Sequence, residues 1–191
     1  MLTILIPCFN EETLIEKTFT QVNKSLKILD IKNYEIIFID DGSTDKSFEK
    51  INEIAKIDER VITIKNKRNY GLGYNIQKGI RISRGDYFIF IPGDNSHSSN
   101  EIIKILEFIN SNYDLITTYY SNRSEQSFLR HIFTRLYTPF LNFLYGTNFY
   151  YFNGLTLYKT KDLKNLKFIN NSFSFQIEIF VYLFYKKNLK L

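Results

Sequence analysis

The sequence predicts a single α/β domain with a mostly parallel sheet flanked by helices. Three observations predict it: a length of 191 residues, short apolar runs that alternate with helical patterns over the first 120 residues, and acidic loops after three of those runs. A chain of this length fits one full-sized domain. Because strands joined through helices are usually parallel neighbours, this order places helices on both faces of the sheet.

Five short runs rich in β-branched and aromatic residues are expected to be buried strands. They cover residues 2–6, 35–39, 61–64, 87–91 and 115–119. The helical patterns between them cover residues 12–29, 44–57, 73–83 and 99–111. In the last of these, Ile102, Ile105, Leu106 and Ile109 have the spacing of one buried helix face.

The last third of the chain changes character and is expected to form a sub-region added to the same domain. Residues 128–145 form an aromatic-rich helical segment with basic residues, interrupted by Pro139. Residues 148–159 are typical of a strand or hairpin around Asn153 and Gly154, and residues 174–185 of a final helix.

Composition narrows the function classes. The formal net charge is +5 and aromatic residues make up 17% of the chain, which fits anionic lipid, phosphorylated ligands or nucleic acid, or only the codon bias of an AT-rich genome. A single cysteine, Cys8, excludes a disulfide framework within the chain and fits a reducing compartment. No run approaches the roughly 18 apolar residues of a membrane span, and the first residues lack the features of a secretory signal. We therefore expect a soluble-looking, cytosol-facing domain.

Polar loops follow three of the predicted strands, where open parallel sheets bind ligands. They read PCFNEE at residues 7–12, DDGSTD at 40–45 and PGDNSH at 92–97. The second loop alone is typical of a turn before an N-capped helix. Asp94 in the third loop either makes a turn or supplies an oxygen ligand to a magnesium or manganese ion. Because this edge is acidic, we expect no nucleic-acid partner.

The glycine-bearing loop NYGLGYN at residues 69–75 opens another predicted helix. It lacks the third glycine and the strand-turn spacing of a dinucleotide fingerprint. Its two glycines therefore indicate close backbone packing rather than a Rossmann dehydrogenase.

In this order and spacing, the loops and the segment NYGLGYNIQKGI resemble family 2 glycosyltransferases, which have the GT-A (Rossmann-like) fold. The resemblance is strongest to the branch that includes polyprenyl- and dolichol-phosphate mannose synthases. It implies inverting transfer of a hexose from a UDP- or GDP-linked sugar to polyprenyl phosphate at the cytoplasmic membrane face. It also implies a nucleotide-sugar-binding half at residues 1–120 and an acceptor-side sub-region at residues 121–191.

The same resemblance assigns roles to residues. The nucleotide sugar would be bound by Pro7, Phe9, Glu11, Asp40, Asp41 and Gly93. Asp94 and Ser96 would hold Mg²⁺ or Mn²⁺. The acceptor phosphate would be bound by Arg123, Arg130 and Thr134, and the sugar side of the cleft would be lined by Asn153, Gly154 and Gln176. The residues expected to act in catalysis are Asp94, Arg130 and Glu178, the last as a base if one is needed.

The sequence also departs from this family in ways that keep two alternatives open. Relatives usually carry Asp-x-Asp after the fourth strand, whereas this chain has Pro92, Gly93 and Asp94. The alternatives are a family 2 transferase acting on a glycan hydroxyl and a catalytically impaired nucleotide-binding module. Relatives usually continue beyond this length, so we expect a C-terminal truncation, weak or absent activity of the chain alone, and membrane association through the missing region.

Overall fold

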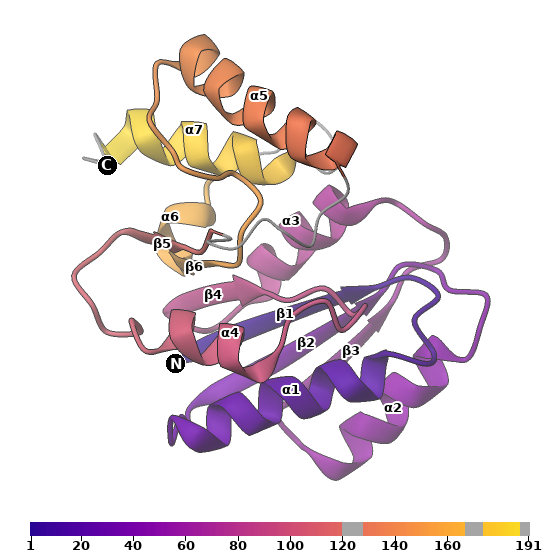
Figure 1. Ribbon diagram of the computed structural model, residues 1–191. Helices are drawn as coiled ribbons and strands as arrows, with labels where there is room; N and C mark the ends of the chain where they lie inside the picture. The colour runs from indigo at the N-terminus through magenta and orange to yellow at the C-terminus, as the bar shows by residue number, and fades with distance from the viewer. Residues whose placement is uncertain (120–127, 167–173, 188–191) are drawn as a thin grey trace.

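The computed structural model describes residues 1–119, 128–166 and 174–187 (Figure 1). In the helices that border the gaps, side chains are described from residue 136 onward and up to residue 186. The predicted site residues Arg123, Arg130 and Thr134 therefore have no described side chains.

In the described part of the chain, one six-stranded sheet has the order β3-β2-β1-β4-β6-β5. The strands are β1 (Leu2–Cys8), β2 (Tyr34–Asp40), β3 (Val61–Lys65), β4 (Tyr87–Phe90), β5 (Leu115–Thr117) and β6 (Thr156–Lys159). The first four are parallel neighbours, whereas β6 is antiparallel to both β4 and β5. The prediction of a mostly parallel sheet is confirmed, with all five predicted strands present.

Helices cover both faces of this sheet (Figure 1). One face carries α1 (Ile15–Ile28), α2 (Ser47–Ile57) and α4 (Ser99–Leu106). The other carries α3 (Leu72–Ile82), α5 (Phe128–Tyr145), α6 (Thr160–Leu163) and α7 (Phe175–Lys187).

Strand β1 shows why two cores form. Successive side chains of a strand point to opposite faces, so Ile4 and Ile6 enter the core under α1 and α4 while Leu5 enters the core under α3 and α7. All three are fully buried. Each contributes about 1.5–3 kcal/mol through burial, which keeps the strand that leads into the first polar loop rigid.

Helix α4 confirms the predicted buried face but ends earlier than predicted. Ile102, Ile105 and Leu106 are buried, whereas Ile109, the fourth member of the predicted face, lies beyond the helix and is partly buried. The helix starts with a capping box, in which Glu101 Oε2 accepts the Ser98 backbone N–H at 2.7 Å. It ends at Leu106 rather than at residue 111, and Asn110 adopts a left-handed backbone with φ 73° that a continuing helix does not allow.

For the last third, one prediction was wrong and one was confirmed for one of its two alternatives. Pro139 does not interrupt the helix, because α5 runs continuously through it; a solvent-exposed helix can hydrate the carbonyl that a proline leaves unbonded. The strand or hairpin predicted for residues 148–159 is a strand, β6, and no second strand pairs with it within that segment. The segment before β6 is instead tied to α5: the Asn142 side chain donates to Phe149 O and accepts the Phe149 N–H, at 2.8 and 3.0 Å.

The division at residue 120 remains a prediction. The sheet itself crosses that boundary, because β6 from the later part lies between β4 and β5 from the earlier part.

Glu35 is a buried carboxylate at the edge of the sheet opposite the polar loops. It is 1% exposed and accepts hydrogen bonds from the Thr3 hydroxyl, the Arg84 backbone N–H and the Arg84 guanidinium, all at 2.6–2.7 Å. Burial alone would raise the pKa of Glu35, but these hydrogen bonds outweigh it and hold the pKa below the ordinary value of 4.5.

We expect Glu35→Gln to lower the free energy of unfolding by about 1.5 kcal/mol at pH 7, because a hydrogen-bonded charge is lost. A pKa lowered by folding stabilises the protein fully above the unfolded value of 4.5, and this contribution is lost as pH falls through the folded value. Urea unfolding at pH 7 and at pH 3 measures the difference. A gap between variant and parent that stays constant with pH would contradict this account.

Candidate active site

A cleft of about 280 Å³ opens at the carboxyl ends of β1, β2 and β4. Parallel strands end together at one edge, so loops that are far apart in sequence meet there. The residues that line the cleft are Pro7, Cys8, Phe9, Glu11, Asp41, Asn69, Gly71, Leu72, Asn75, Pro92, Gly93 and Asp94. Six of the predicted site residues, namely Pro7, Phe9, Glu11, Asp41, Gly93 and Asp94, are therefore brought together.

Reciprocal hydrogen bonds join the loops after β1 and β2. Asn10 Oδ1 accepts the Thr44 backbone N–H at 2.9 Å, while the Asn10 backbone N–H donates to Ser43 Oγ at 2.9 Å. The Glu11 backbone N–H donates to Ser47 Oγ at 2.7 Å. These contacts fix one wall of the cleft to the start of α2.

Asp41 is held in place by the loop that leads into α3. Its Oδ1 accepts the Tyr70 backbone N–H at 3.0 Å and the Asn66 amide at 2.8 Å, and its Oδ2 accepts the Gly71 backbone N–H at 2.9 Å. The residue is 3% exposed but lines the cleft. Since a carboxylate offers about four lone-pair sites, one further N–H or O–H donor can still be accepted from a ligand.

The loop after β4 is fixed to α1 while its carboxylate stays exposed. Thr18 Oγ1 donates to Gly93 O at 2.9 Å and accepts the Asn95 backbone N–H at 3.0 Å. Asp94 is exposed and uses Oδ1 to accept the Ser96 backbone N–H at 3.0 Å. The other oxygen, Oδ2, has no partner among the residues that the structure describes and is free for a ligand.

The carboxylates of Glu11 and Asp94 fit a divalent cation whose remaining ligands come from a bound phosphate and water. Burial raises the pKa of Glu11, and the negative charges of Asp94 and then Asp45 raise it further. A cation beside Asp94 would relieve that repulsion. Within residues 1–119, 128–166 and 174–187 no three His, Cys, Asp or Glu side chains form a metal cage by themselves. Mg²⁺ is commonly held by one or two carboxylates with phosphates and waters completing its shell.

Two predicted residues of this region lie outside the cleft lining. Asp40 is fully buried, and its Oδ2 accepts the Ser43 backbone N–H at 3.3 Å. Ser96 is exposed and contributes its backbone N–H to Asp94. Their roles toward a ligand remain predictions.

The residues predicted for the sugar side lie around the start of β6. Gln176 is 3% exposed, and its amide nitrogen donates to Gly154 O at 2.6 Å and to Thr156 Oγ1 at 3.0 Å. Asn153 is exposed, and Glu178 lies partly exposed in the first turn of α7. Neither these three sugar-side residues nor Glu178 line the cleft described above.

The structure adds residues that the sequence analysis did not assign. Asn69 and Gly71 line the cleft from the loop before α3, and Leu72 and Asn75 line it from the start of α3. Asn66 directly follows β3 and contacts Asp41. The position of Asn66 could have indicated its place near the cleft, since a polar residue at the carboxyl end of a parallel strand lies at the ligand-binding edge.

A family model described as glycosyl transferase family 2 matches residues 3–167. The chain belongs to glycosyl transferase family 2. The predicted resemblance to that family is therefore confirmed.

Curated relatives of this family 2 chain include undecaprenyl-phosphate 4-deoxy-4-formamido-L-arabinose transferases. The protein from Proteus mirabilis is 34% identical over 127 residues, which is 66% of this chain and 39% of the relative. An uncharacterised glycosyltransferase, YkcC from Bacillus subtilis, is 29% identical over 67% of this chain and 39% of its own length. The chain thus spans about two-fifths of the length of these relatives.

Solved structures confirm the GT-A fold of this family 2 chain. Glucosyl-3-phosphoglycerate synthase from Mycobacterium tuberculosis, in complex with Mn²⁺, UDP and phosphoglyceric acid, superposes with a TM-score of 0.69 at 21% identity and covers 97% of this chain and 64% of that one. S. aureus TarS 1–349 with UDP-GlcNAc gives a TM-score of 0.66 at 17% identity, covering 95% of this chain and 53% of that one.

Proposed function

We propose that this chain carries the donor-binding part of an inverting glycosyltransferase that moves a sugar, expected from the sequence to be a hexose, from a nucleotide diphosphate to polyprenyl phosphate. The observation that supports it most is the cleft at the carboxyl ends of β1, β2 and β4, which brings Asp41 and Asp94 together. The curated relatives, named for transfer involving undecaprenyl phosphate, support the acceptor class.

The chemistry of Asp41 favours a uridine or guanosine donor. Its carboxylate already accepts three N–H groups, and its remaining lone pairs can accept only another hydrogen-bond donor. Uracil and guanine carry an N–H on a ring nitrogen of the pairing edge, whereas in cytosine and adenine that nitrogen is an acceptor and only the exocyclic amino group donates. Phe9, which lines the cleft and is partly exposed, offers an aromatic face for the base.

Asp94 would hold Mg²⁺ or Mn²⁺ on the donor diphosphate, with Ser96 as the neighbouring ligand that the sequence predicts. A cation bound there supplies charge neutralisation for the leaving diphosphate. The protein groups keep the sugar oriented: the Thr18 contacts fix the loop of Asp94, and the bonds of Asn10 and Glu11 fix the opposite wall. Orientation of this kind is a large part of catalysis in group transfer.

A lipid phosphate acceptor needs no strong general base. The second pKa of a phosphate monoester is about 6, so its oxygen is already anionic at neutral pH. Attack of that oxygen on the anomeric carbon forms the new C–O bond as the bond to the nucleotide diphosphate breaks, with inversion. Arg130 and Thr134 are the residues predicted to bind the acceptor phosphate. A glycan hydroxyl would instead require a base, and Glu178 is the predicted candidate.

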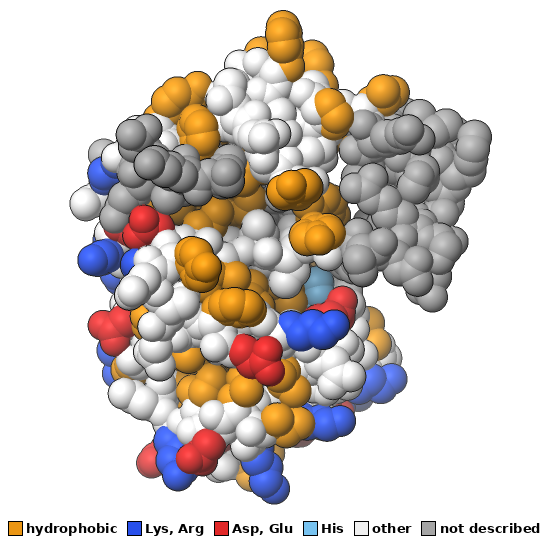
Figure 2. Space-filling model, turned by 60° about the vertical axis from the view of Figure 1, so that its left-hand side comes forward, with side chains coloured by type: hydrophobic (Ala, Val, Ile, Leu, Met, Phe, Trp, Pro, Cys, Tyr) orange, Lys and Arg blue, Asp and Glu red, His pale blue; other side chains and the backbone are white. Residues whose placement is uncertain are grey.

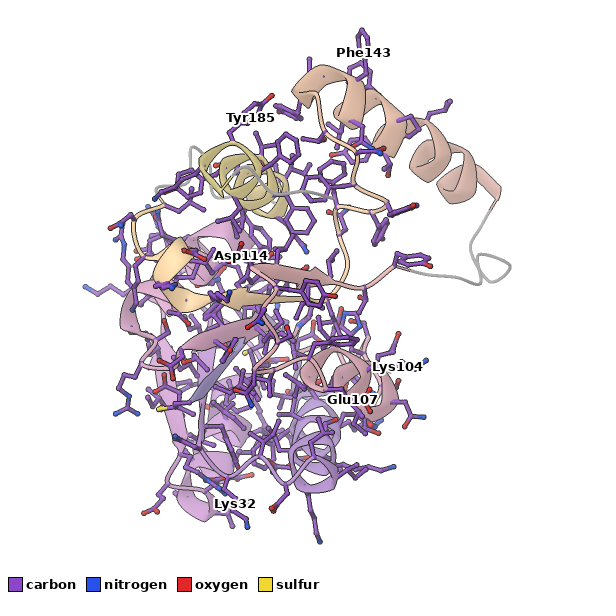
Figure 3. The ribbon with its side chains drawn as sticks, turned by 90° about the vertical axis from the view of Figure 1, so that its left-hand side faces the viewer. Lys32, Lys104, Glu107, Asp114, Phe143 and Tyr185 are labelled. Atoms are coloured by element: carbon purple, nitrogen blue, oxygen red, sulfur yellow. The ribbon has the colours of Figure 1, made fainter. Side chains whose placement is uncertain are left out.

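Helix α5 supports a membrane surface as the place of this reaction. From residue 136 onward, where its side chains are described, the exposed ones are apolar or aromatic, and Phe143 is 87% exposed and points away from the body of the molecule (Figure 3). The exposed members of this face are Leu136, Tyr137, Phe140, Phe143 and Leu144. Charged side chains are concentrated below it (Figure 2). A helix with such a face binds the interface of a bilayer, and no described helix is long and apolar enough to cross one.

Arg130 provides the test of the acceptor. We expect Arg130→Ala to reduce transfer to polyprenyl phosphate by at least about a hundredfold, because a charge-assisted contact to the attacking phosphate is removed. Binding of the nucleotide should be unchanged. Transfer assays and calorimetry with UDP and GDP measure the two effects separately.

The matched control is Lys104→Ala, which removes one positive charge from α4 on the other face of the sheet (Figure 3). Full activity of Arg130→Ala would contradict a lipid phosphate acceptor and favour a glycan hydroxyl. Metal-independent nucleotide binding by the parent, with no turnover of any donor, would favour the impaired binding module.

A further inference from the structure

We infer that Lys78 and Asn66 are positioning residues that hold Asp41 ready for the nucleotide, although neither lines the cleft. The inference rests on the proposed function, since it concerns the residue predicted to contact the base or ribose. It adds a second layer of residues behind the cleft, reaching from the middle of α3 through the end of β3 to the ligand-binding edge.

A chain of short hydrogen bonds connects these residues. The Lys78 ammonium donates to Asn66 Oδ1 at 2.8 Å. The Asn66 amide nitrogen donates to Asp41 Oδ1 at 2.8 Å and to Asn75 Oδ1 at 2.7 Å. Asn75 in turn donates to Gly71 O at 3.1 Å, so both amides have fixed orientations.

Burial favours a single arrangement of these hydrogen bonds. Asp41, Asn66 and Asn75 are all at least 95% buried, so little water is available to replace a lost partner. An unpaired polar group in such a place costs about 1–3 kcal/mol. The three side chains therefore keep their contacts or shift together.

Lys78 stabilises the orientation of the Asn66 amide that Asp41 and Asn75 also require. If the amide turned over, its oxygen would face the Asp41 carboxylate and its NH₂ group would face the Lys78 ammonium. Both contacts would be repulsive, because a carboxylate only accepts hydrogen bonds and an ammonium only donates them. With Lys78 present, Asn66 must offer its N–H to Asp41.

The hydrogen bonds around Asp41 determine which of its lone pairs remain free for a ligand in the cleft. Asn66, Tyr70 and Gly71 occupy fixed positions around the carboxylate, which leaves the remaining acceptor direction toward the cleft. Without Lys78, the buried Asn66 oxygen loses its donor, so Asn66 is held less firmly and its hydrogen bond to Asp41 weakens. Nucleotide affinity and discrimination between bases should then fall, while the reacting atoms near Asp94 are untouched.

The experiment compares Lys78→Met, Lys78→Arg and Asn66→Leu with the parent. Arg81→Met is the matched control, because it removes a positive charge from an exposed position on the same helix. Calorimetry with UDP, GDP, CDP and ADP in Mn²⁺ gives affinity and base discrimination. Steady-state kinetics separate KM from kcat, and hydrogen exchange reports the Tyr70 and Gly71 amides without any nucleotide.

We expect Lys78→Met to weaken binding of the preferred diphosphate by about tenfold, as for the loss of one charged hydrogen bond. Its preference over CDP or ADP should shrink, KM should rise with kcat unchanged, and the Tyr70 and Gly71 amides should exchange faster. Lys78→Arg should keep the properties of the parent, and so should Arg81→Met. Asn66→Leu should bind the preferred diphosphate as weakly as Lys78→Met does, or more weakly.

Two results would overturn the inference. One is unchanged affinity, discrimination and amide exchange in Lys78→Met; the other is an equal loss for all four nucleotides together with a fall in kcat, which indicates general damage. A parent that binds none of the nucleotides contradicts the proposed function instead. In that case the amide exchange of Tyr70 and Gly71 alone decides whether Lys78 positions Asp41.

Discussion

Asp94→Asn is expected to reduce sugar transfer by at least about a hundredfold while leaving the stability of the fold unchanged. The residue is exposed, and its only described contact is with the backbone N–H of Ser96 in its own loop, so an amide fits the same space. What is lost is the negative charge toward a cation on the donor diphosphate. Because Pro92 stands where relatives usually carry another carboxylate, the loss should be larger than if two acids shared the ion.

The control for Asp94→Asn is Glu107→Gln, an equivalent loss of charge at the exposed end of α4 (Figure 3). Transfer by that variant should equal transfer by the parent. Calorimetry with UDP or GDP should show that Asp94→Asn loses the Mn²⁺-dependent part of the binding. Unchanged metal dependence in Asp94→Asn would mean that the cation is held elsewhere.

Gly154→Ala is expected to have the largest effect on stability, with a loss of at least about 3 kcal/mol in the free energy of unfolding. A Cβ at this position would overlap the backbone oxygen of Thr118 and lie 2.9 Å from its carbonyl carbon. Neither backbone can move easily. Thr118 donates its N–H to Leu155 O at 2.9 Å, and Gln176 donates to Gly154 O.

Gly146→Ala separates steric overlap from backbone strain. Gly146 has φ 59°, but a Cβ there would meet only the Tyr185 hydroxyl, at 3.6 Å. Its cost should be about 1–2 kcal/mol, the strain of a left-handed residue alone. Urea unfolding of both variants makes the comparison, and equal losses would show that the approach of Thr118 is not what requires glycine at residue 154.

The sequence was sufficient for the parts of the fold that depend on local pattern. The β-branched runs gave all five predicted strands, and the spacing of Ile102, Ile105 and Leu106 gave the buried face of α4. The order of strands and helices also placed Asp41 and Asp94 at one edge, because parallel strands share their carboxyl ends.

Contacts between distant segments were beyond the sequence. The antiparallel insertion of β6 between β4 and β5 depends on pairing between residues at least 39 positions apart. The two hydrogen bonds that link Lys78 to Asn66 and Asn66 to Asp41 form only where α3 meets the ends of β3 and β2. Gln176 has the residue type of a ligand-binding group, yet it binds the backbone of Gly154, a use that its type does not indicate.

Transfer of a sugar from a nucleotide diphosphate to a lipid phosphate can be measured in a single assay. The most direct measurement incubates the protein, in molar excess over labelled UDP- and GDP-linked sugars, with Mg²⁺, a short-chain polyprenyl phosphate and, separately, a glycan acceptor. The excess of protein lets a single turnover be seen. We expect label in the organic phase as a sugar joined to polyprenyl phosphate. Label that passes only to the glycan, or donor that binds and is never consumed, would contradict it.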